Sequence, residues 1–205
     1  MNFAKVIGIS IGTLLLLFSG VSICLGGPAP KADSIKTIDS TATHPKSPIK
    51  EKIFVNWPKS GNWVAGEVVP GPPRVDIFYP KGQSANNWTE MGTVEYDPNW
   101  KKTDLGGMAR IIFLGTQKGS PHAKWNILAK GYKDEQTKSY PFTFFRIDCP
   151  DFASGESAQV QFWLLLVGKS GLFTVQYSFK GSEIPEKKGN DILETMQNAH
   201  IEVVK

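Results

Sequence analysis

The segment from Ala158 to Val167 constrains the fold more than any other part of this 205-residue chain. Its first half alternates apolar and polar residues, and its second half, Trp163 to Val167, is apolar at every position. A strand with apolar side chains on both faces needs a cover on both sides. The sequence therefore predicts a central strand, buried between two layers.

A second strand follows the turn Gly168 to Gly171, so the two strands form a hairpin. From Phe173 to Phe179, apolar residues alternate strictly with Thr174, Gln176 and Ser178. Strict alternation predicts one buried face and one face that is wet or lightly covered.

Further strands are predicted from apolar runs between polar or proline-containing turns. Residues 53–57 and 63–69 read as a hairpin around Pro58 to Gly61, and residues 125–132 and 139–147 read as another. Residues 75–79 and 89–96 are two more candidate strands.

Two segments have helical spacing. Residues 104–118 begin with a capping Asp104 and then place apolar side chains three and four positions apart. The second helix starts at the capping box Asp191 to Glu194 and continues with an apolar stripe of Ile192, Leu193, Met196, Ala199 and Val203. We expect the second helix to pack on the sheet.

This order of elements, together with two short motifs, carries a family resemblance. The motifs are N-W-T-E-M at Asn87 to Met91 and G-K-S-G-L-F-T-V-Q-Y at Gly168 to Tyr177, which resemble a group of exported bacterial proteins. The chain, from about Phe54 to His200, resembles the PsbP-like or DcrB-like α/β sandwich. The resemblance implies an α+β fold with a single antiparallel β-sheet and helices packed on it. It implies binding or scaffolding and no reaction.

The first 26 residues have the pattern of a bacterial secretory signal peptide. Lys5 precedes an uncharged, mostly apolar run from Val6 to Leu25, and small residues follow. This pattern predicts cleavage after Gly26. Two alternatives stay open. The run is long enough to remain as an uncleaved membrane anchor, and Cys24 is a candidate for lipidation, although Ile23 before it is bulkier than a lipobox residue.

Composition divides the rest of the chain into two parts. Residues 27–51 carry four prolines among Lys, Ser and Thr and lack aromatic residues, which predicts a flexible linker. Residues 52–205 hold all six tryptophans and are long enough for one α+β domain. The formal charge of +4 is small and its acidic and basic residues are interspersed, which argues against nucleic acid as a partner.

Residues of catalytic type are scarce. Without the leader, Cys149 is the single cysteine, and the three histidines, His44, His122 and His200, do not pair at metal-ligand spacing. Neither H-E-x-x-H nor G-x-S-x-G occurs. We therefore expect no cofactor and no metal, and the sequence favours a protein that is not an enzyme.

Four side chains are candidates for a ligand-binding site: Trp88, Glu90, Trp100 and Arg146. Trp88 is either a ligand platform or a lid over the core, and Glu90 either contacts a ligand or caps the preceding loop. Trp100 lies in a loop and anchors either a partner or its own domain. Arg146 lies in an aromatic strand, where it meets an anionic ligand or forms an ion pair on the strand face.

Together these features predict an exported bacterial protein, periplasmic or secreted, that serves as a non-enzymatic binding or scaffold module of the cell envelope or as a secreted factor. Its partner is a protein or a small ligand, and a membrane only if the leader is retained or Cys24 is lipidated. One alternative is a cofactorless hydrolase-type enzyme with Glu90 or Asp148 as its base. Another is a membrane-anchored or lipoprotein structural component.

Overall fold

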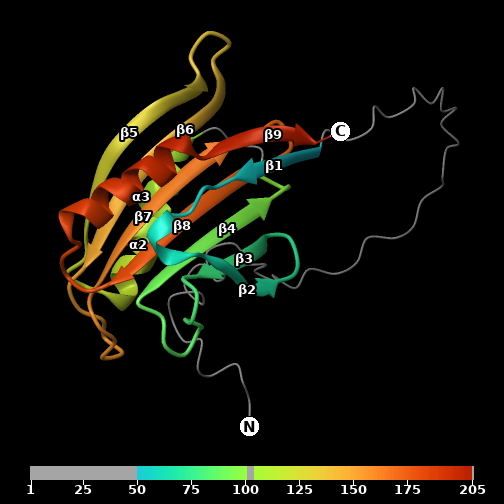
Figure 1. Ribbon diagram of the computed structural model, residues 1–205. Coiled ribbons are helices and arrows are strands. Elements are labelled where there is room, and N and C mark those ends of the chain that lie inside the picture. The colour runs from blue at the N-terminus through green and yellow to red at the C-terminus, as the bar shows by residue number, and fades with distance from the viewer. Residues whose placement is uncertain (1–49, 101–103, 205) are drawn as a thin grey trace, which may run out of the picture.

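An antiparallel sheet of seven strands, in the order β2-β3-β4-β8-β7-β6-β5, forms the centre of the molecule (Figure 1). The computed structural model describes residues 50–100 and 104–204. The strands of this main sheet are β2 (Val64–Val69), β3 (Arg74–Tyr79), β4 (Glu90–Asp97), β5 (Lys124–Asp134), β6 (Ser139–Cys149), β7 (Gln159–Val167) and β8 (Leu172–Lys180). Strands β5 to β8 are neighbours both in sequence and in space, so successive hairpins build this half of the sheet.

A separate sheet of two strands pairs β1 (Lys50–Phe54) with β9 (His200–Val204) in antiparallel orientation. The expectation of a single sheet is therefore wrong: the described residues are mostly strand, in two sheets with two α-helices. Residues 53–57 do not form the predicted hairpin with residues 63–69. The segment between them contains the short 3₁₀ helix η2 (Lys59–Gly61), and β1 takes the C-terminal strand as its partner.

The C-terminal helix α3 (Glu186–Asn198) ends earlier than its apolar stripe predicts. Ala199 has an extended backbone, with φ −62° and ψ 131°, and the chain continues as β9. Val203, expected as the last apolar position of the helix, lies in this strand. The β-branched residues of β9 favour a strand, and β1 supplies hydrogen-bond partners along one edge of it.

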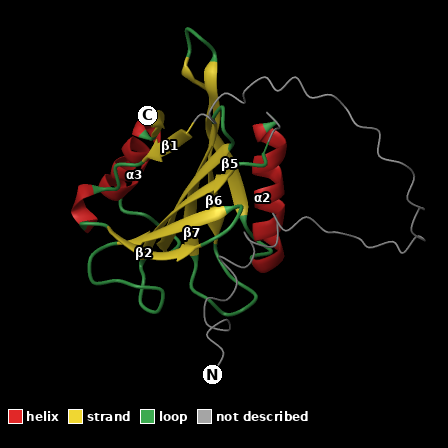
Figure 2. Cartoon of the chain, turned by 90° about the vertical axis from the view of Figure 1, so that its right-hand side faces the viewer, coloured by secondary structure: helices red, strands yellow, loops and turns green. Residues whose placement is uncertain are grey.

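The two α-helices lie on opposite faces of the main sheet (Figure 2). Helix α2 (Leu105–Gly119) confirms the helix predicted over residues 104–118. It begins where the Asp104 carboxylate accepts a hydrogen bond of 2.9 Å from the backbone N–H of Gly107. No helix in the described part of the chain combines the length and hydropathy needed to cross a bilayer.

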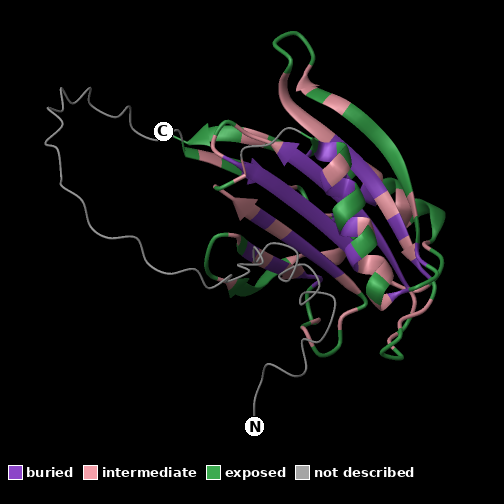
Figure 3. Cartoon of the chain, turned by 180° about the vertical axis from the view of Figure 1, so that it is seen from behind, coloured by how far each residue is buried: buried purple, intermediate pink, exposed green. Residues whose placement is uncertain are grey.

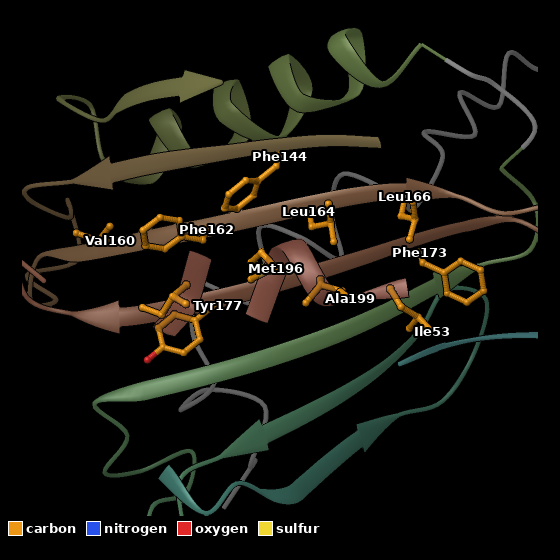
Figure 4. Packing of buried hydrophobic residues seen from close by; sticks show 12 residues of the cluster. Ile53, Phe144, Val160, Phe162, Leu164, Leu166, Phe173, Tyr177, Met196 and Ala199 are labelled. Atoms are coloured by element: carbon orange, nitrogen blue, oxygen red, sulfur yellow. The ribbon is translucent and has the colours of Figure 1, made fainter. Parts of the chain in front are cut away.

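Strand β7 runs through the middle of the core (Figure 3). All of its residues except Val167 are buried, which confirms the predicted central strand covered on both faces. Towards α3 it contributes Phe162 and Leu164 to an apolar cluster that includes Tyr177 and Met196 (Figure 4). Towards α2 its side chains join a second cluster, which includes Trp163, Leu165, Phe145, Met108 and Ile112.

The polar face of β8 is buried, so the expectation of a wet or lightly covered face is wrong. Thr174, Gln176 and Ser178 are at most 3% exposed. The Gln176 amide donates to the Ser178 hydroxyl at 2.9 Å and accepts from the Thr93 hydroxyl at 3.5 Å. Because Thr93, Gln176 and Ser178 satisfy one another in this way, these three side chains can be buried at little cost.

Candidate functional site

A groove of about 600 Å³ lies between β1 and a floor formed by β3, β4 and β8, and we name it the β1 groove. Ligand pockets typically enclose about 300–1,000 Å³. The residues that line it are Glu51, Lys52, Ile53, Phe54, Val55, Trp57, Arg74, Asp76, Phe78, Val94, Tyr96 and Phe173.

Two contacts hold β1 above the main sheet. The Ile53 side chain is buried in the apolar cluster on the α3 side. The Glu51 carboxylate accepts hydrogen bonds from the backbone N–H of Ser170 at 2.7 Å and from its hydroxyl at 2.8 Å. Because Ser170 lies in the turn between β7 and β8, these bonds tie the wall of the groove to the central hairpin.

Trp57 closes one end of the groove, directly above Gly92 of β4. A Cβ atom at Gly92 would lie 2.6 Å from the Trp57 ring, so the close approach of the indole requires glycine. The Trp57 ring also stacks on Trp63 at 5.1 Å between centroids and contacts Phe78 at 5.5 Å. This end is therefore a packed aromatic cluster.

The floor of the groove is apolar and aromatic. Tyr96 and Phe173 are paired across β4 and β8, and their rings stack with centroids 4.8 Å apart. The Tyr96 hydroxyl donates to the carbonyl of Ser170 at 3.1 Å, and the Tyr96 side chain lines the groove. Val94 lies between these aromatic residues and Gly92 on the same strand face.

An ion pair lies at the rim. The Arg74 guanidinium and the Asp76 carboxylate, on the same face of β3, are 2.7 Å apart, and 58% of the Arg74 side chain is exposed. Three of the titratable groups of the rim and wall are thus already engaged, Arg74 with Asp76 and Glu51 with Ser170. This arrangement suits binding of an apolar body with a polar edge, and it offers no free base beside a nucleophile.

Glu90, a residue predicted to bind a ligand, lies outside the β1 groove. Its carboxylate accepts hydrogen bonds from the Tyr177 hydroxyl and from the Lys188 ammonium of α3, and its side chain is 12% exposed. Burial of the Tyr177 side chain raises its pKa, and the hydrogen bond to Glu90 raises it further. Glu90 lines a shallow pocket of about 440 Å³ beside the start of α3.

The other three predicted site residues make their contacts in different places, although Trp88 is only two residues before Glu90 in the chain. Arg146 forms an ion pair of 2.7 Å with Asp148 and lies 5.6 Å from the Phe162 ring centroid, over β6 and β7. Trp88 packs with the cluster of Val75, Ile77, Tyr79 and Met91. Trp100 packs against the cluster around α2.

The structure therefore does not assemble Trp88, Glu90, Trp100 and Arg146 into one site, and a ligand role for each stays a prediction. Cys24, the candidate for lipidation, lies outside the described residues. In the described part of the chain, no group of three His, Cys, Asp or Glu side chains is placed to hold a metal ion.

A buried carboxyl group, Glu95, lies on the opposite face of β4 from the groove. It is 2% exposed, and neither of its oxygens has a hydrogen-bond partner. Burial, and to a smaller extent the charge of Asp97, raises the pKa of Glu95 to about 8. Its cross-strand neighbour Thr174 also has an unpartnered hydroxyl.

The residues that build the β1 groove were missed by the sequence analysis. One signal was present: the alternation of β3 places Arg74, Asp76 and Phe78 on one face and the apolar Val75 and Ile77 on the other. The wall carried no local signal, because its position depends on the pairing of β1 with β9.

Comparisons with known proteins give a weak likeness. No family model matches the chain, and no curated protein matches it. The chain is similar to the Ran-binding protein Mog1p of Saccharomyces cerevisiae, at 12% identity and a TM-score of 0.44, over 77% of this chain and 97% of that chain. It is also similar to cyanobacterial PsbP (CyanoP) from Synechocystis sp. PCC 6803, at 11% identity and a TM-score of 0.44, over 80% of this chain and 98% of that chain.

One of these two structures is a PsbP, the family named by the resemblance in the sequence. At this level of similarity neither structure carries an inference about ligand or function. The DcrB-like part of the resemblance and the group defined by N-W-T-E-M stay predictions.

Proposed function

We propose that this chain is a non-enzymatic binding module and that the β1 groove is its binding site. The observation that carries the proposal is the groove itself, with a stacked aromatic floor of Tyr96 and Phe173, a wall that includes Ile53, and an ion pair at its rim. A concave apolar surface with a few polar groups at its edge is typical of ligand sites. Burying the partly exposed apolar side chains of the groove, Phe78, Val94 and Tyr96, is the main driving force for binding.

Titration with 1-anilinonaphthalene-8-sulfonate tests this proposal, because the dye has an apolar body and one anionic group. We expect saturable binding that weakens by about tenfold in Tyr96→Ala, since the variant loses half of the stacked floor. Tyr132→Ala is the matched control, because Tyr132 is exposed on β5 and does not line the groove. Equal binding by Tyr96→Ala and the wild type would contradict the proposal.

We also propose that the module is exported to the periplasm or the medium, on the strength of the leader at residues 1–26. Intact mass spectrometry of the protein recovered from the envelope and from the culture medium tests this. The expected mature chain begins at Gly27. A mass that begins at Met1 would favour the retained anchor, and a lipid adduct on Cys24 would favour the lipoprotein.

A further inference from the structure

We propose that the ligand of the β1 groove is an extended peptide segment of a partner protein, which adds a strand to the free edge of β1. This inference rests on the proposed function and adds the chemistry of the ligand. The groove is lined by five successive residues, Glu51 to Val55. Successive side chains of a strand point to opposite faces, so a cavity over one face would be lined by every second residue only. Because all five residues line this cavity, it lies along the edge of the strand.

Within the described residues, that edge has unpaired backbone groups. Among the described strands β1 pairs with β9 alone, in a register from Lys50 opposite Val204 to Phe54 opposite His200. In an antiparallel pair, every second residue directs its N–H and C=O away from its partner. On β1 these groups point to the groove side, where they can bind the backbone of an incoming strand.

The floor fits the alternation of such a peptide. Phe78, Val94, Tyr96 and Phe173 lie beneath the edge of β1 and form an apolar surface. Every second side chain of an extended peptide would face this floor, so we expect apolar or aromatic residues at alternate positions. A compact small molecule would use the floor and leave the backbone groups of the wall unpaired, so the groove fits a strand better.

Charge selects the residues between the apolar positions. Lys50 and Lys52 lie on the outer face of β1, and neither forms an ion pair within the described residues. Acidic side chains in the paired strand would lie opposite these lysines and stabilise the pair. Two copies of β1 would bring like charges together, which disfavours a second copy of this chain. The expected partner segment therefore alternates apolar and acidic residues.

A phage-displayed library of random dodecamer peptides, selected on the full chain, tests the proposal. We expect enriched peptides to alternate apolar and acidic residues and to compete with 1-anilinonaphthalene-8-sulfonate. Lys52→Glu should weaken their binding by about tenfold. Lys124→Glu is the matched control, because Lys124 is an exposed lysine on the far edge strand β5.

N-methylation of a selected peptide separates pairing with the edge from simple burial. Methyl groups on one set of alternate amides should reduce binding by about tenfold or more, and methyl groups on the other set should have little effect, because one set alone faces β1. If neither set matters, strand addition is wrong although the groove still binds. If the dye binds and no selected peptide competes with it, the ligand is a small apolar molecule and the inference is wrong.

Two further results are decisive. A chain that sediments as a dimer, and as a monomer after Tyr96→Ala, would make a second copy the occupant and overturn the inference. If the wild-type chain shows no saturable binding of the dye, the proposed function itself is wrong. Failure of strand addition and failure of the binding function therefore give different results.

Discussion

Glu95 places a carboxyl group without a hydrogen-bond partner inside the main sheet. Because burial raises its pKa from 4.5 to about 8, the folded chain binds the proton more tightly than the unfolded chain. The contribution of Glu95 to stability is therefore fully present below the pKa of the unfolded chain, and it is lost as the pH rises towards the pKa of the folded chain. Between about pH 4.5 and 8 we expect unfolding free energy to fall by up to about 1.4 kcal/mol per pH unit from this group.

Urea denaturation at a series of pH values measures this dependence. Glu95→Gln should flatten it and should be more stable than the wild type at the alkaline end, because the amide needs no proton to stay neutral. Glu183→Gln is the control, since Glu183 is exposed. An unchanged pH dependence in Glu95→Gln would show that Glu95 is not the group responsible.

Cys149, at the end of β6, is 1% exposed, and burial raises the pKa of its thiol to about 12 although Ser120 lowers it in part. At neutral pH a thiol with such a raised pKa is almost entirely protonated, and only the thiolate reacts. We expect native Cys24→Ser protein, in which Cys149 is the remaining cysteine, to resist iodoacetamide at mildly alkaline pH. The same protein unfolded in urea should be alkylated fully, as intact mass will show. Rapid alkylation of the native form would contradict the buried thiol.

At the scale of single elements, the close contact of β4 with Trp57 makes Gly92 a sensitive position. Gly92→Ala puts a methyl group 2.6 Å from the indole, so the ring must move. Overpacking of this kind costs about 1–3 kcal/mol, and we expect that loss in urea denaturation together with a shifted tryptophan emission spectrum.

The matched control is Gly106→Ala in α2. Its new Cβ would lie 3.6 Å from the nearest atom of Asp104, an ordinary contact. Alanine is a better helix former than glycine, so this variant should be more stable by about 0.5–1 kcal/mol. Gly92→Ala with wild-type stability and emission would contradict the contact of Trp57 with β4.

Elements with strong local patterns were predicted well, and those that depend on distant pairing were not. The all-apolar half of β7 and the capped α2 both have a local cause, and both are present. In contrast, the apolar spacing of α3 extends to Val203, where the residues belong to β9. Helical spacing and strand pairing compete for such a segment, and a partner at the other end of the chain decides the outcome.

The candidate site shows the same limit more strongly. Arg74, Asp76 and Phe78 could be assigned to one face of a strand from the sequence, but no pattern indicated that this face forms the floor of a groove. Conversely, Glu90 at the start of a strand and Arg146 within an aromatic strand were predicted to meet a ligand, and each lies in an ion pair. The partner of Glu90 is Lys188 of α3, a contact that the sequence around β4 does not indicate. The partner of Arg146 is Asp148 on the same strand, which is the ion pair on the strand face predicted from the sequence as one of its two roles.

At the scale of the whole molecule, the binding wall belongs to a part of the fold with little buried surface. In β1 and β9 together, Ile53 is the one buried residue, whereas β7 is buried almost throughout. Opening free energies follow such differences in burial, so the sheet of β1 and β9 should open locally while the main sheet stays folded.

Native-state hydrogen exchange measures this difference directly. In the wild type we expect the amides of β1 and β9 to exchange faster than those of β7 and β8, and by a denaturant-insensitive route that indicates local opening. A peptide paired with β1 would slow the exchange of alternate amides in that strand and leave β7 unchanged. If β1 exchanges as slowly as β7 in the free chain, the wall is part of the global folding unit. A ligand of the groove would then meet a preformed edge without ordering it.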